Sequence, residues 1–326
     1  METILIIGGS GFIGSNFIRR IMKRKNYRVV NFDALTYAGN PDNLIDIEKN
    51  PRYTFVKGDI RIPKNLTAVF KRYRPEYVIN FAAETHVDRS IHESPAVFLQ
   101  TNAAGVLNIL EAVRDYPVKK FLHVSTDEVY GTLSLTGGKP FTEASPLRPN
   151  SPYSASKAAG DLICRAYFET WGLPIVITRC SNNFGPYQYP EKLIPFFVLR
   201  AMKGETLTLY GDGKNVRDWI YVEDHCNALE LALFKAKPGS LYNIGATHEV
   251  SNLEIAQRIA DYFKLSRSKI TFIKDRPGHD RRYALNALKI KKELGWQPRA
   301  QFDTVFKQTI EWYEQHSAWI NKLNIK

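Results

Sequence analysis

The stretch TILIIGGSGFIGS, residues 3–15, decides the fold of this chain. A short apolar run with β character leads directly into Gly8, Gly11 and Gly14, and a helical pattern follows at once. Glycines at this spacing let the turn close, let the backbone approach a pyrophosphate and let the helix pack on the strand. Asp33 ends the next apolar run, where a carboxylate can accept hydrogen bonds from the ribose of adenosine. The combination predicts an NAD site, because Asp33 would repel the 2′-phosphate of NADP.

Strand-like runs alternate with helical patterns through the first half of the chain. The expected strands cover residues 3–9, 28–33, 54–59, 77–83, 120–126 and 174–180, and the expected helices cover residues 12–24, 63–74, 95–115 and 152–171. This alternation predicts an α/β fold, a doubly wound parallel-sheet Rossmann domain over residues 1–180, with ligands at the carboxyl ends of the strands. Shorter elements follow, which predicts a smaller α/β C-terminal lobe for the substrate, mainly residues 181–326. Some later segments are expected to return to the large sheet, and a last amphipathic helix is expected over residues 303–320.

Composition narrows the class of protein. Hydrophobic residues make up 44% and charged residues 24% of the 326 residues, as in ordinary soluble domains. The three cysteines, Cys164, Cys180 and Cys226, form no CxxC pair, so we expect no disulfide framework, no metal site and a cytoplasmic location. The first apolar run is too short and too glycine-broken for a signal peptide or a membrane span.

The chain carries a formal net charge of +12, and residues 264–300 hold eleven Lys and Arg against three acids. Three interpretations of this basic region stay open: a solvated face, a pocket for a small anion, or a surface for a polyanion.

A Tyr and a Lys four residues apart share one face of a helix, and the ammonium can lower the pKa of the phenol so that it acts as a base. The YxxxK spacing occurs four times. Tyr153 and Lys157 are the pair that follows a helix-start signal, Pro152, and precedes a sustained helical pattern. The other pairs are Tyr53/Lys57 in a strand pattern, Tyr116/Lys120 around a proline and Tyr210/Lys214 across the GDG turn.

The segment FLHVSTDEVYG, residues 121–131, places Asp127 and Glu128 directly after an apolar strand. Two adjacent carboxylates there could form a solvated strand end or a helix cap. They could equally be an acid and a base, because the carboxyl end of this strand is expected to meet Asp33 and Tyr153 at one edge of the sheet.

Together, GxxGxxG, DALTYAGN, STDEVYG, YSASK and RCSNNFGPYQYPEKLIP resemble the extended short-chain dehydrogenase/reductase family. Within it, FAAETHVDRSI, YGDGKNVRDWIYVEDH and DRPGHDRRYALNALKI are similar to the nucleoside-diphosphate-sugar 4,6-dehydratases. The resemblance runs from Ile4 to about Phe302 and covers both expected lobes. One departure is Gln188, where the family often has His.

The resemblance implies a reaction in four parts. C4 of the hexose is oxidised, the C5 proton is removed, the C6 hydroxyl leaves as water, and hydride returns to C6. Tyr153 and Lys157 would serve the oxidation, Thr126 would bind the C4 oxygen, Glu128 would be the C5 base and Asp127 the acid. Because adjacent carboxyls with opposite roles titrate as a pair, we expect Asp127 to be held protonated.

The resemblance also implies ligands and an assembly. It implies NAD contacts at Gly8, Gly11, Phe12, Ile13, Gly14, Asp33, Ala34, Leu35, Thr36, Asp59, Ile60, Ala82, Ala83, Thr101, Tyr153, Lys157 and Asn183. It implies substrate contacts at Thr85, Thr126, Asn182, Lys192, Leu193, Tyr210, Arg217, Asn252, Arg276 and His279. The implied substrate is dTDP-glucose, with a UDP-sugar as the alternative and a non-catalytic sensor or scaffold as a remote one. We expect a homodimer through residues 95–115 and 152–171, and neither nucleic acid nor membrane as a partner.

Overall fold

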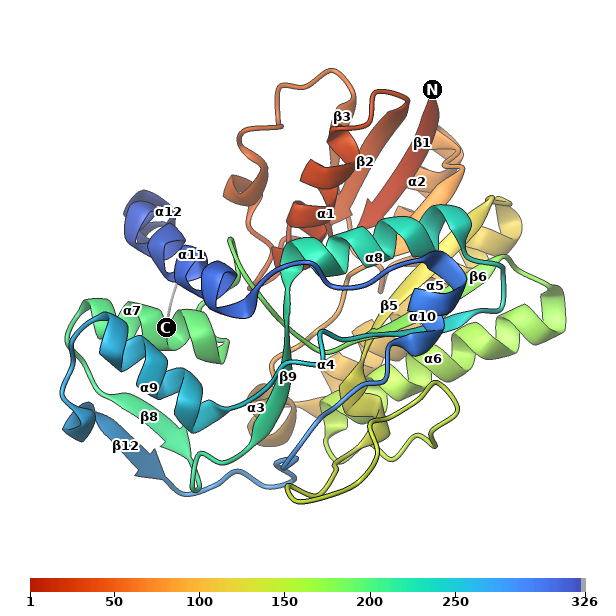
Figure 1. Cartoon of the computed structure of the whole chain (residues 1–326). Helices are drawn as coiled ribbons and strands as arrows, with labels where there is room; N and C mark the ends of the chain where they lie inside the picture. The colour runs from red at the N-terminus through yellow and green to blue at the C-terminus, as the bar shows by residue number, and fades with distance from the viewer. Residues whose placement is uncertain (324–326) are drawn as a thin grey trace.

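A parallel sheet of seven strands lies at the centre of residues 1–323, the part of the chain that the computed structural model describes (Figure 1). Its strands are β1 Glu2–Ile7, β2 Tyr27–Asp33, β3 Tyr53–Lys57, β4 Tyr77–Asn80, β5 Lys120–Thr126, β6 Ile175–Cys180 and β10 Leu241–Ile244. Their order is β10-β6-β5-β4-β1-β2-β3, and every neighbouring pair is parallel. The strand order reverses between β1 and β4, which is where open α/β sheets bind their ligands. The predicted doubly wound Rossmann sheet is confirmed.

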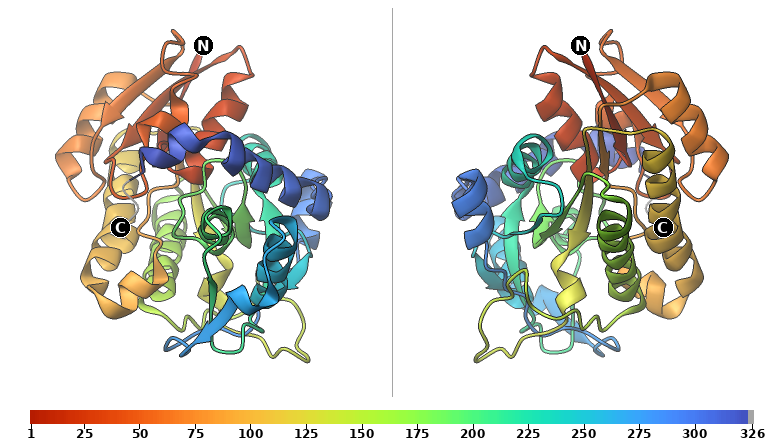
Figure 2. Two further views of the ribbon diagram at one scale, coloured as in Figure 1. Left: turned by 90° about the vertical axis from the view of Figure 1, so that its left-hand side faces the viewer. Right: turned by 90° about the vertical axis from the view of Figure 1, so that its right-hand side faces the viewer.

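Both faces of the sheet are buried, because side chains along each strand alternate between two apolar clusters. In β1, Ile4 and Ile6 join one cluster, and Leu5 and Ile7 join the other. The first face is covered by α1 Phe12–Met22, α8 Val222–Lys235 and α10 Leu288–Leu294. The second face is covered by α2 Pro63–Tyr73, α5 Gly105–Asp115 and α6 Pro152–Trp171. The two side views show these layers, with α8 on one side of the sheet and α6 on the other (Figure 2).

A second lobe sits over the carboxyl ends of these strands. One small sheet contains β7 Asn182–Phe184, β9 Val216–Tyr221 and β11 Glu249–Ser251, and another pairs β8 Leu207–Tyr210 with β12 Ile270–Ile273. Around a third apolar cluster pack α7 Leu193–Met202, α9 Asn252–Tyr262 and α11 Phe302–Gln315. The chain crosses between lobes more than once, because α8 and β10 lie on the large sheet although they follow β9 in sequence. Short elements complete the structure: η1 Pro41–Leu44, α3 Val87–His92, η3 Asp127–Tyr130, η4 Arg267–Lys269 and α12 Ser317–Asn321.

Two expected helices differ from the structure. The helix expected over residues 95–115 consists of α4 Pro95–Leu99, a π-helical turn Gln100–Ala104 and α5. The single helix expected over residues 303–320 is wrong, because α11 ends at Gln315 and α12 begins at Ser317. His316 breaks the helix with φ −114° and ψ 40°, and its ring stacks on Trp312 with centroids 4.2 Å apart.

Residues 95–115 are also, among residues 1–323, the one helical stretch long and apolar enough to cross a membrane by length and composition alone. In this fold 44% of its most apolar 18-residue segment is buried, and Val106, Ile109 and Leu110 pack in the core of the second face. Leu99 and Leu107 remain exposed on the same stretch, as do Leu162 and Trp171 on α6.

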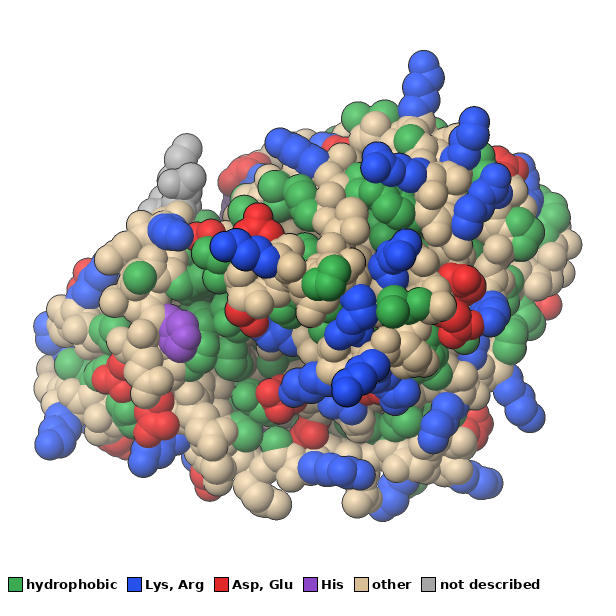
Figure 3. All heavy atoms as spheres, turned by 90° about the horizontal axis from the view of Figure 1, so that it is seen from above, with side chains coloured by type: hydrophobic (Ala, Val, Ile, Leu, Met, Phe, Trp, Pro, Cys, Tyr) green, Lys and Arg blue, Asp and Glu red, His purple; other side chains and the backbone are tan. Residues whose placement is uncertain are grey.

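The basic region is partly neutralised by acids from elsewhere in the chain. Arg276 pairs with Asp88, Arg281 with Asp212 and Arg282 with Glu249, and a fourth pair joins Arg267 to Asp261. Seen from above, lysine and arginine side chains are spread over the molecule with acidic side chains among them (Figure 3). Four of the eleven basic side chains in residues 264–300 are therefore paired with acids.

Candidate active site

The turn between β1 and α1 needs glycine for steric reasons. Gly8 has φ +78°, and a Cβ there would lie 2.5 Å from the backbone nitrogen of Ala82. A Cβ on Gly14 would lie 2.4 Å from the Gly8 carbonyl oxygen. Gly11 is the N-cap of α1, so no side chain stands between the first turn of the helix and the cleft. Helix N–H groups presented in this way suit a pyrophosphate.

Asp33 is held against this turn at the end of β2. Its carboxylate accepts hydrogen bonds from the backbone N–H of Ser10 at 2.9 Å and of Leu35 at 2.8 Å. Burial raises the pKa of Asp33, and these two backbone donors oppose the rise. A carboxylate fixed at this position matches what the ribose of a dinucleotide requires.

A narrow cavity of about 100 Å³ runs along the turn, at the switch point between β1 and β4. Ten of the predicted NAD contacts line it: Gly8, Gly11, Asp33, Ala34, Thr36, Asp59, Ile60, Ala82, Ala83 and Thr101. Seven lie outside its walls: Phe12, Ile13, Gly14, Leu35, Tyr153, Lys157 and Asn183. Further wall residues that the sequence reasoning missed include Ala38, Gly39, Arg61 and Glu84. Each of them lies close in sequence to a predicted contact, so the motifs pointed to the right segments.

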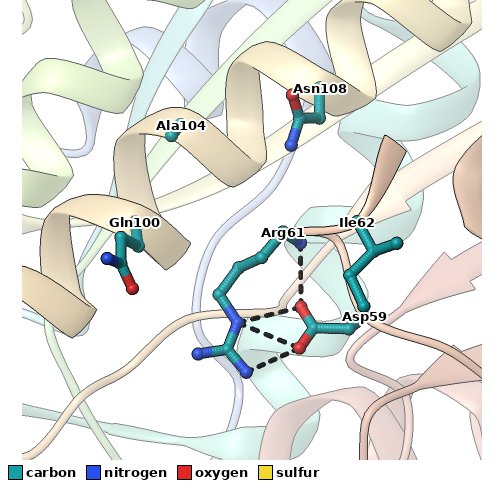
Figure 4. A pocket seen from close by; sticks show the side chains of 6 residues that line it. All are labelled: Asp59, Arg61, Ile62, Gln100, Ala104 and Asn108. Atoms are coloured by element: carbon teal, nitrogen blue, oxygen red, sulfur yellow. Dashed lines mark hydrogen bonds and ion pairs between the residues drawn. The ribbon is translucent and has the colours of Figure 1, made fainter. Parts of the chain in front are cut away.

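A larger cavity of about 430 Å³ lies beside this one (Figure 4), lined by Asp59, Arg61, Ile62, Gln100, Ala104 and Asn108. None of the predicted catalytic residues is among them, so cavity size does not locate the chemistry. The guanidinium of Arg61 folds back on Asp59, with Nη2 2.6 Å from Oδ2. Burial would raise the pKa of Asp59, but the hydrogen bonds from Arg61 outweigh it and lower the pKa.

The two adjacent carboxyls occupy the first turn of η3, directly after β5. Thr126 caps this short helix, with its hydroxyl oxygen accepting the Glu128 N–H at 3.3 Å. The same hydroxyl donates to Asp127 Oδ1 at 3.3 Å. Asp127 is only 2% exposed, and its Oδ2 has no hydrogen-bond partner among residues 1–323. A buried polar atom left free in this way is suited to a partner that arrives with a ligand.

The two carboxyls differ in their electrostatic surroundings. Burial raises the pKa of Asp127 well above its ordinary value, and the charges of Glu128 and Asp218 add to the rise. Burial also raises the pKa of Glu128, but Arg276, Lys192 and Arg217 all oppose it. Burial and two neighbouring acids thus favour the protonated form of Asp127, against the charge of Arg217, whereas three cations favour the carboxylate form of Glu128. This is the acid and base division that enzymes with paired carboxyls use.

Helix α6 brings Tyr153 and Lys157 to the same place. A capping box between Ser151 and Ser154, with Pro152 at the first turn, fixes the start of this helix. Lys157 Nζ donates to the Val124 carbonyl oxygen of β5 at 2.9 Å. Both side chains are buried.

The expected lowering of the Tyr153 pKa is wrong for the chain by itself. Burial raises the pKa of the phenol well above its ordinary value, and the charge of Glu128 adds to it. The hydroxyl of Thr126 opposes the rise by hydrogen bonding. Burial also lowers the pKa of the Lys157 ammonium, against the charge of Asp161 one turn further along α6.

The second lobe supplies cations and amides around Glu128. Arg217, on β9, donates to the carbonyl oxygens of Val216 and Asp280, and its guanidinium lies over the Tyr283 ring at 4.3 Å. Arg276 Nη1 is 2.8 Å from Asp88, while its buried Nε has no partner among residues 1–323. These contacts hold the guanidinium groups in place before a ligand arrives.

The remaining predicted substrate residues are spread around this centre. Lys192 Nζ donates to the Thr85 carbonyl oxygen at 2.8 Å, and Leu193 begins α7 directly after it. Tyr210 ends β8 and donates to Asp88 at 3.1 Å. His279 pairs with Asp275 at 2.6 Å, and burial, followed by the charge of Arg276, lowers its pKa to about 4.

Two amides complete the predicted set. Asn182 lies on β7, and its Oδ1 is buried without a partner in the described chain, residues 1–323. Asn252 begins α9, and its backbone N–H donates to the Asn215 carbonyl oxygen at 2.9 Å. The next amide along β7, Asn183, bonds to His225 at 2.8 Å. Gln188, the departure from the family pattern, donates to the Asn183 carbonyl oxygen at 2.8 Å.

Two further groups at the site were not found from the sequence. The Tyr37 hydroxyl bonds to Thr85 at 3.2 Å and to Glu191 at 3.0 Å, which ties the loop before α7 to the loop after β2. Asp218 is fully buried beside Asp127, and burial raises its pKa to about 6. Tyr37 lies inside the DALTYAGN motif and Asp218 inside YGDGKNVRDWIYVEDH, so the motifs contained both residues without marking them as parts of the site. Within residues 1–323 no group of three or more His, Cys, Asp or Glu is placed to hold a metal ion.

Comparison with known proteins identifies the relatives of this chain. The family model described as GDP-mannose 4,6 dehydratase matches residues 5–309. The chain is 50% identical to the dTDP-glucose 4,6-dehydratase of Xanthomonas campestris pv. campestris (strain B100), over 98% of this chain and 95% of that one.

Solved structures agree. The crystal structure of dTDP-glucose 4,6-dehydratase from Bacillus anthracis in complex with NAD matches with a TM-score of 0.92 and 46% identity, over 99% of this chain and 100% of that one. The enzyme of the same name from Streptomyces venezuelae, also with NAD bound, matches with a TM-score of 0.93 and 44% identity, over 97% of this chain and 98% of that one. These matches confirm the resemblance that the motifs indicated. The chain therefore belongs to the GDP-mannose 4,6-dehydratase family, and the relatives that it matches over nearly their whole length are dTDP-glucose 4,6-dehydratases.

Proposed function

We propose that this chain is a hydro-lyase that converts dTDP-glucose to dTDP-4-keto-6-deoxy-glucose and water with NAD as its cofactor. The observation that carries the proposal is the buried Asp127, whose Oδ2 has no hydrogen-bond partner among residues 1–323, beside Glu128 at the carboxyl end of β5. The glycine turn, Asp33 and the cavity between β1 and β4 fit a dinucleotide. The full-length likeness to proteins named dTDP-glucose 4,6-dehydratase supports the substrate.

Oxidation at C4 requires a base for the proton of the C4 hydroxyl. The glycine turn and Asp33 would hold NAD, which would supply the acceptor and later the donor of the hydride and, in its oxidised form, a positive charge. Tyr153 is the group placed to receive the hydroxyl proton, and the charge of Lys157 one helical turn away opposes the burial that raises the phenol pKa. Thr126, already a hydrogen-bond donor at this strand end, binds the oxygen that becomes the C4 carbonyl.

Elimination uses the two carboxyls together. The C4 ketone makes the C5 proton acidic, and Glu128, favoured as a carboxylate by three cations, removes it. Asp127 gives its proton to the C6 oxygen as the C6–O bond breaks, so that water leaves. After hydride reaches C6, Glu128 returns its proton to C5. The proton gained by Tyr153 and the one lost by Asp127 balance through solvent.

The cations of the second lobe can also bind the diphosphate of the substrate. We assign Arg217, Lys192 and Arg276 to the phosphates and the sugar, because a guanidinium pairs with phosphate oxygens through two parallel hydrogen bonds. Thymine and uracil differ by one methyl group, which an apolar pocket distinguishes by only about 1 to 3 kcal/mol. A UDP-sugar is thus the competing substrate that an assay must include.

Incubation of the purified protein with dTDP-glucose and, separately, with UDP-glucose tests the function. The 4-keto product is followed by its absorbance in alkali, and Tyr153→Phe serves as the matched control without a phenolic base. We expect product from dTDP-glucose, less from UDP-glucose and almost none from the variant. Product from neither sugar contradicts the proposed function.

We also propose a cytoplasmic homodimer. Leu99, Leu107, Leu162 and Trp171 are exposed on α4, α5 and α6, which pack against one another, and we infer that a second copy covers exposed apolar side chains of these helices. The buried free thiols of all three cysteines are suited to a reducing compartment.

A further inference from the structure

A chain of two hydrogen bonds links the C-terminal helix α12 to the glycine turn. The indole Nε1–H of Trp319 donates to Asn43 Oδ1 at 2.8 Å. Asn43 Nδ2 in turn donates to the Ser10 carbonyl oxygen at 2.9 Å. Ser10 lies between Gly8 and Gly11, in the turn that faces the dinucleotide cavity. Residues near opposite ends of the sequence are thus joined through one amide side chain.

Both the side chain and the backbone of Asn43 are held in place. Its side chain is only 1% exposed, and the guanidinium of Arg19 binds its backbone carbonyl oxygen. The Ser10 carbonyl oxygen accepts a second bond from the Asn40 N–H at 3.0 Å, and the Ser10 N–H donates to Asp33 at 2.9 Å. Both ends of Ser10 are therefore restrained.

The restraint on Ser10 bears on the cofactor through peptide geometry. In a trans peptide the C=O and the following N–H point in opposite directions. With the Ser10 carbonyl fixed toward Asn40 and Asn43, the Gly11 N–H is turned away from them, and the first turn of α1 starts in one orientation. That turn is the part of the fold that meets the pyrophosphate.

Trp319 itself is anchored by aromatic packing. Its ring lies 5.1 Å from Trp312 and 6.0 Å from Tyr187, centroid to centroid, and is 8% exposed. Arg19 lies over the Tyr187 ring at 4.1 Å, so α1 is tied to the same cluster. Helix α12 begins directly after the break at His316. The indole is thus held where its N–H can donate in only one direction.

We propose that Trp319 is a positioning residue for the cofactor, acting through Asn43 to hold the glycine turn in the conformation that retains NAD; this rests on the proposed function. In a dehydratase that returns its hydride to the product, the cofactor need not leave between turnovers. A contact from α12 to the glycine turn therefore helps to retain the cofactor without touching the reacting atoms.

The test compares NAD release from three variants with release from the parent enzyme. Trp319→Phe keeps an aromatic ring and removes the N–H, Asn43→Leu removes the middle of the link, and Trp312→Phe changes a ring of the same cluster that stands outside the link. Each protein is loaded with NAD and freed of excess by gel filtration. The NAD remaining bound is then measured over time, and melting of the cofactor-free forms is recorded in parallel.

We expect Trp319→Phe and Asn43→Leu to release NAD on the order of 10-fold faster than the parent, because each leaves a buried polar group of the link unpaired. Trp312→Phe should release NAD at the parental rate. If Trp319 acts through Asn43, the double variant should release NAD no faster than Asn43→Leu alone.

Other outcomes contradict either the inference or the proposed function. Unchanged release from Trp319→Phe overturns the inference, and so does equal acceleration by Trp312→Phe, because that would show general loosening of the aromatic cluster. If Trp319→Phe does not fold, Asn43→Leu alone decides, and parental release from it overturns the inference. A parent enzyme that binds no NAD refutes the proposed function itself.

Discussion

Replacement of Asp127 by Asn separates the two chemical roles at the end of β5. Asn has nearly the same shape as a protonated Asp but cannot give up a proton at neutral pH. The Asp127 carboxyl is buried and burial raises its pKa, which favours the neutral form that Asn imitates. The hydrogen bond from Thr126 can still be accepted by the amide oxygen of the variant.

The size of the effect follows from the proton that is lost. A positioned general acid contributes about 100- to 10,000-fold to a rate, or about 3 to 5 kcal/mol of barrier. We expect this loss in water elimination, whereas oxidation at C4, which relies on Tyr153 and Lys157, should change only a few-fold. Reduced cofactor should therefore accumulate in the variant during a single turnover.

Stability should move in the opposite direction to activity. The Asp127 pKa is raised in the folded state, so the native chain binds its proton more tightly than the unfolded chain. Stability is therefore lost as pH rises from about 4, the unfolded-state pKa, to the raised folded value. The amide introduced by Asp127→Asn does not titrate, so the variant should gain stability relative to the parent across that window.

The assay follows reduced-cofactor absorbance and product formation in the same single-turnover mixture, with Glu128→Gln as the matched control for the base. Equal loss of oxidation and elimination in Asp127→Asn would contradict the acid assignment. Urea unfolding at several pH values checks the linkage, and a stability difference that does not grow with pH would show that Asp127 is ionised in the folded chain.

Three further predictions concern the supports of the site. Asp161→Asn should lower the free energy of unfolding by about 3 to 5 kcal/mol, because it removes the buried counter-ion of Arg179. The Arg179 guanidinium is 7% exposed and bonded to Asp161 at 2.8 Å. Chemical denaturation measures the loss, and a loss below about 1 kcal/mol would contradict the prediction. Asp33→Ala should weaken NAD more than NADP, so the ratio of the two dissociation constants should shift toward NADP, and an unchanged ratio would remove Asp33 from cofactor selection. Leu162→Glu places a charge at a leucine that is 55% exposed on α6 and should yield monomers in light scattering; a persistent dimer would exclude this face as the interface.

Relations between residues close together in the sequence explain the features that could be predicted. The alternation of strand and helix patterns located the first six strands of the large sheet, because side-chain periodicity is a property of neighbouring residues. Gly8, Gly11, Gly14 and Asp33 were found by their spacing, which reflects the steric needs of one turn. Tyr153 and Lys157 were singled out of four candidate pairs by a helix-start signal, and the structure shows the capping box that this signal implied.

Packing in the tertiary structure explains the features that could not be predicted from the sequence. The helix expected over residues 303–320 breaks at His316, although its sequence periodicity continues across the break, because Trp319 is drawn into the aromatic cluster around Tyr187. The expected fall of the Tyr153 pKa was overridden by burial, a property of the assembled site that no spacing in the sequence records.

The sequence by itself determined the fold class, the dinucleotide turn and the identity of the paired carboxyls, since each depends on residues close together in the chain. Only the tertiary structure revealed the surroundings that separate the two carboxyls, because these include Asp218 from β9, which raises the Asp127 pKa, and cations of the second lobe, which oppose the rise at Glu128. It alone also joined Trp319 to Ser10 through Asn43, since contacts between distant segments arise from the packing of the whole chain.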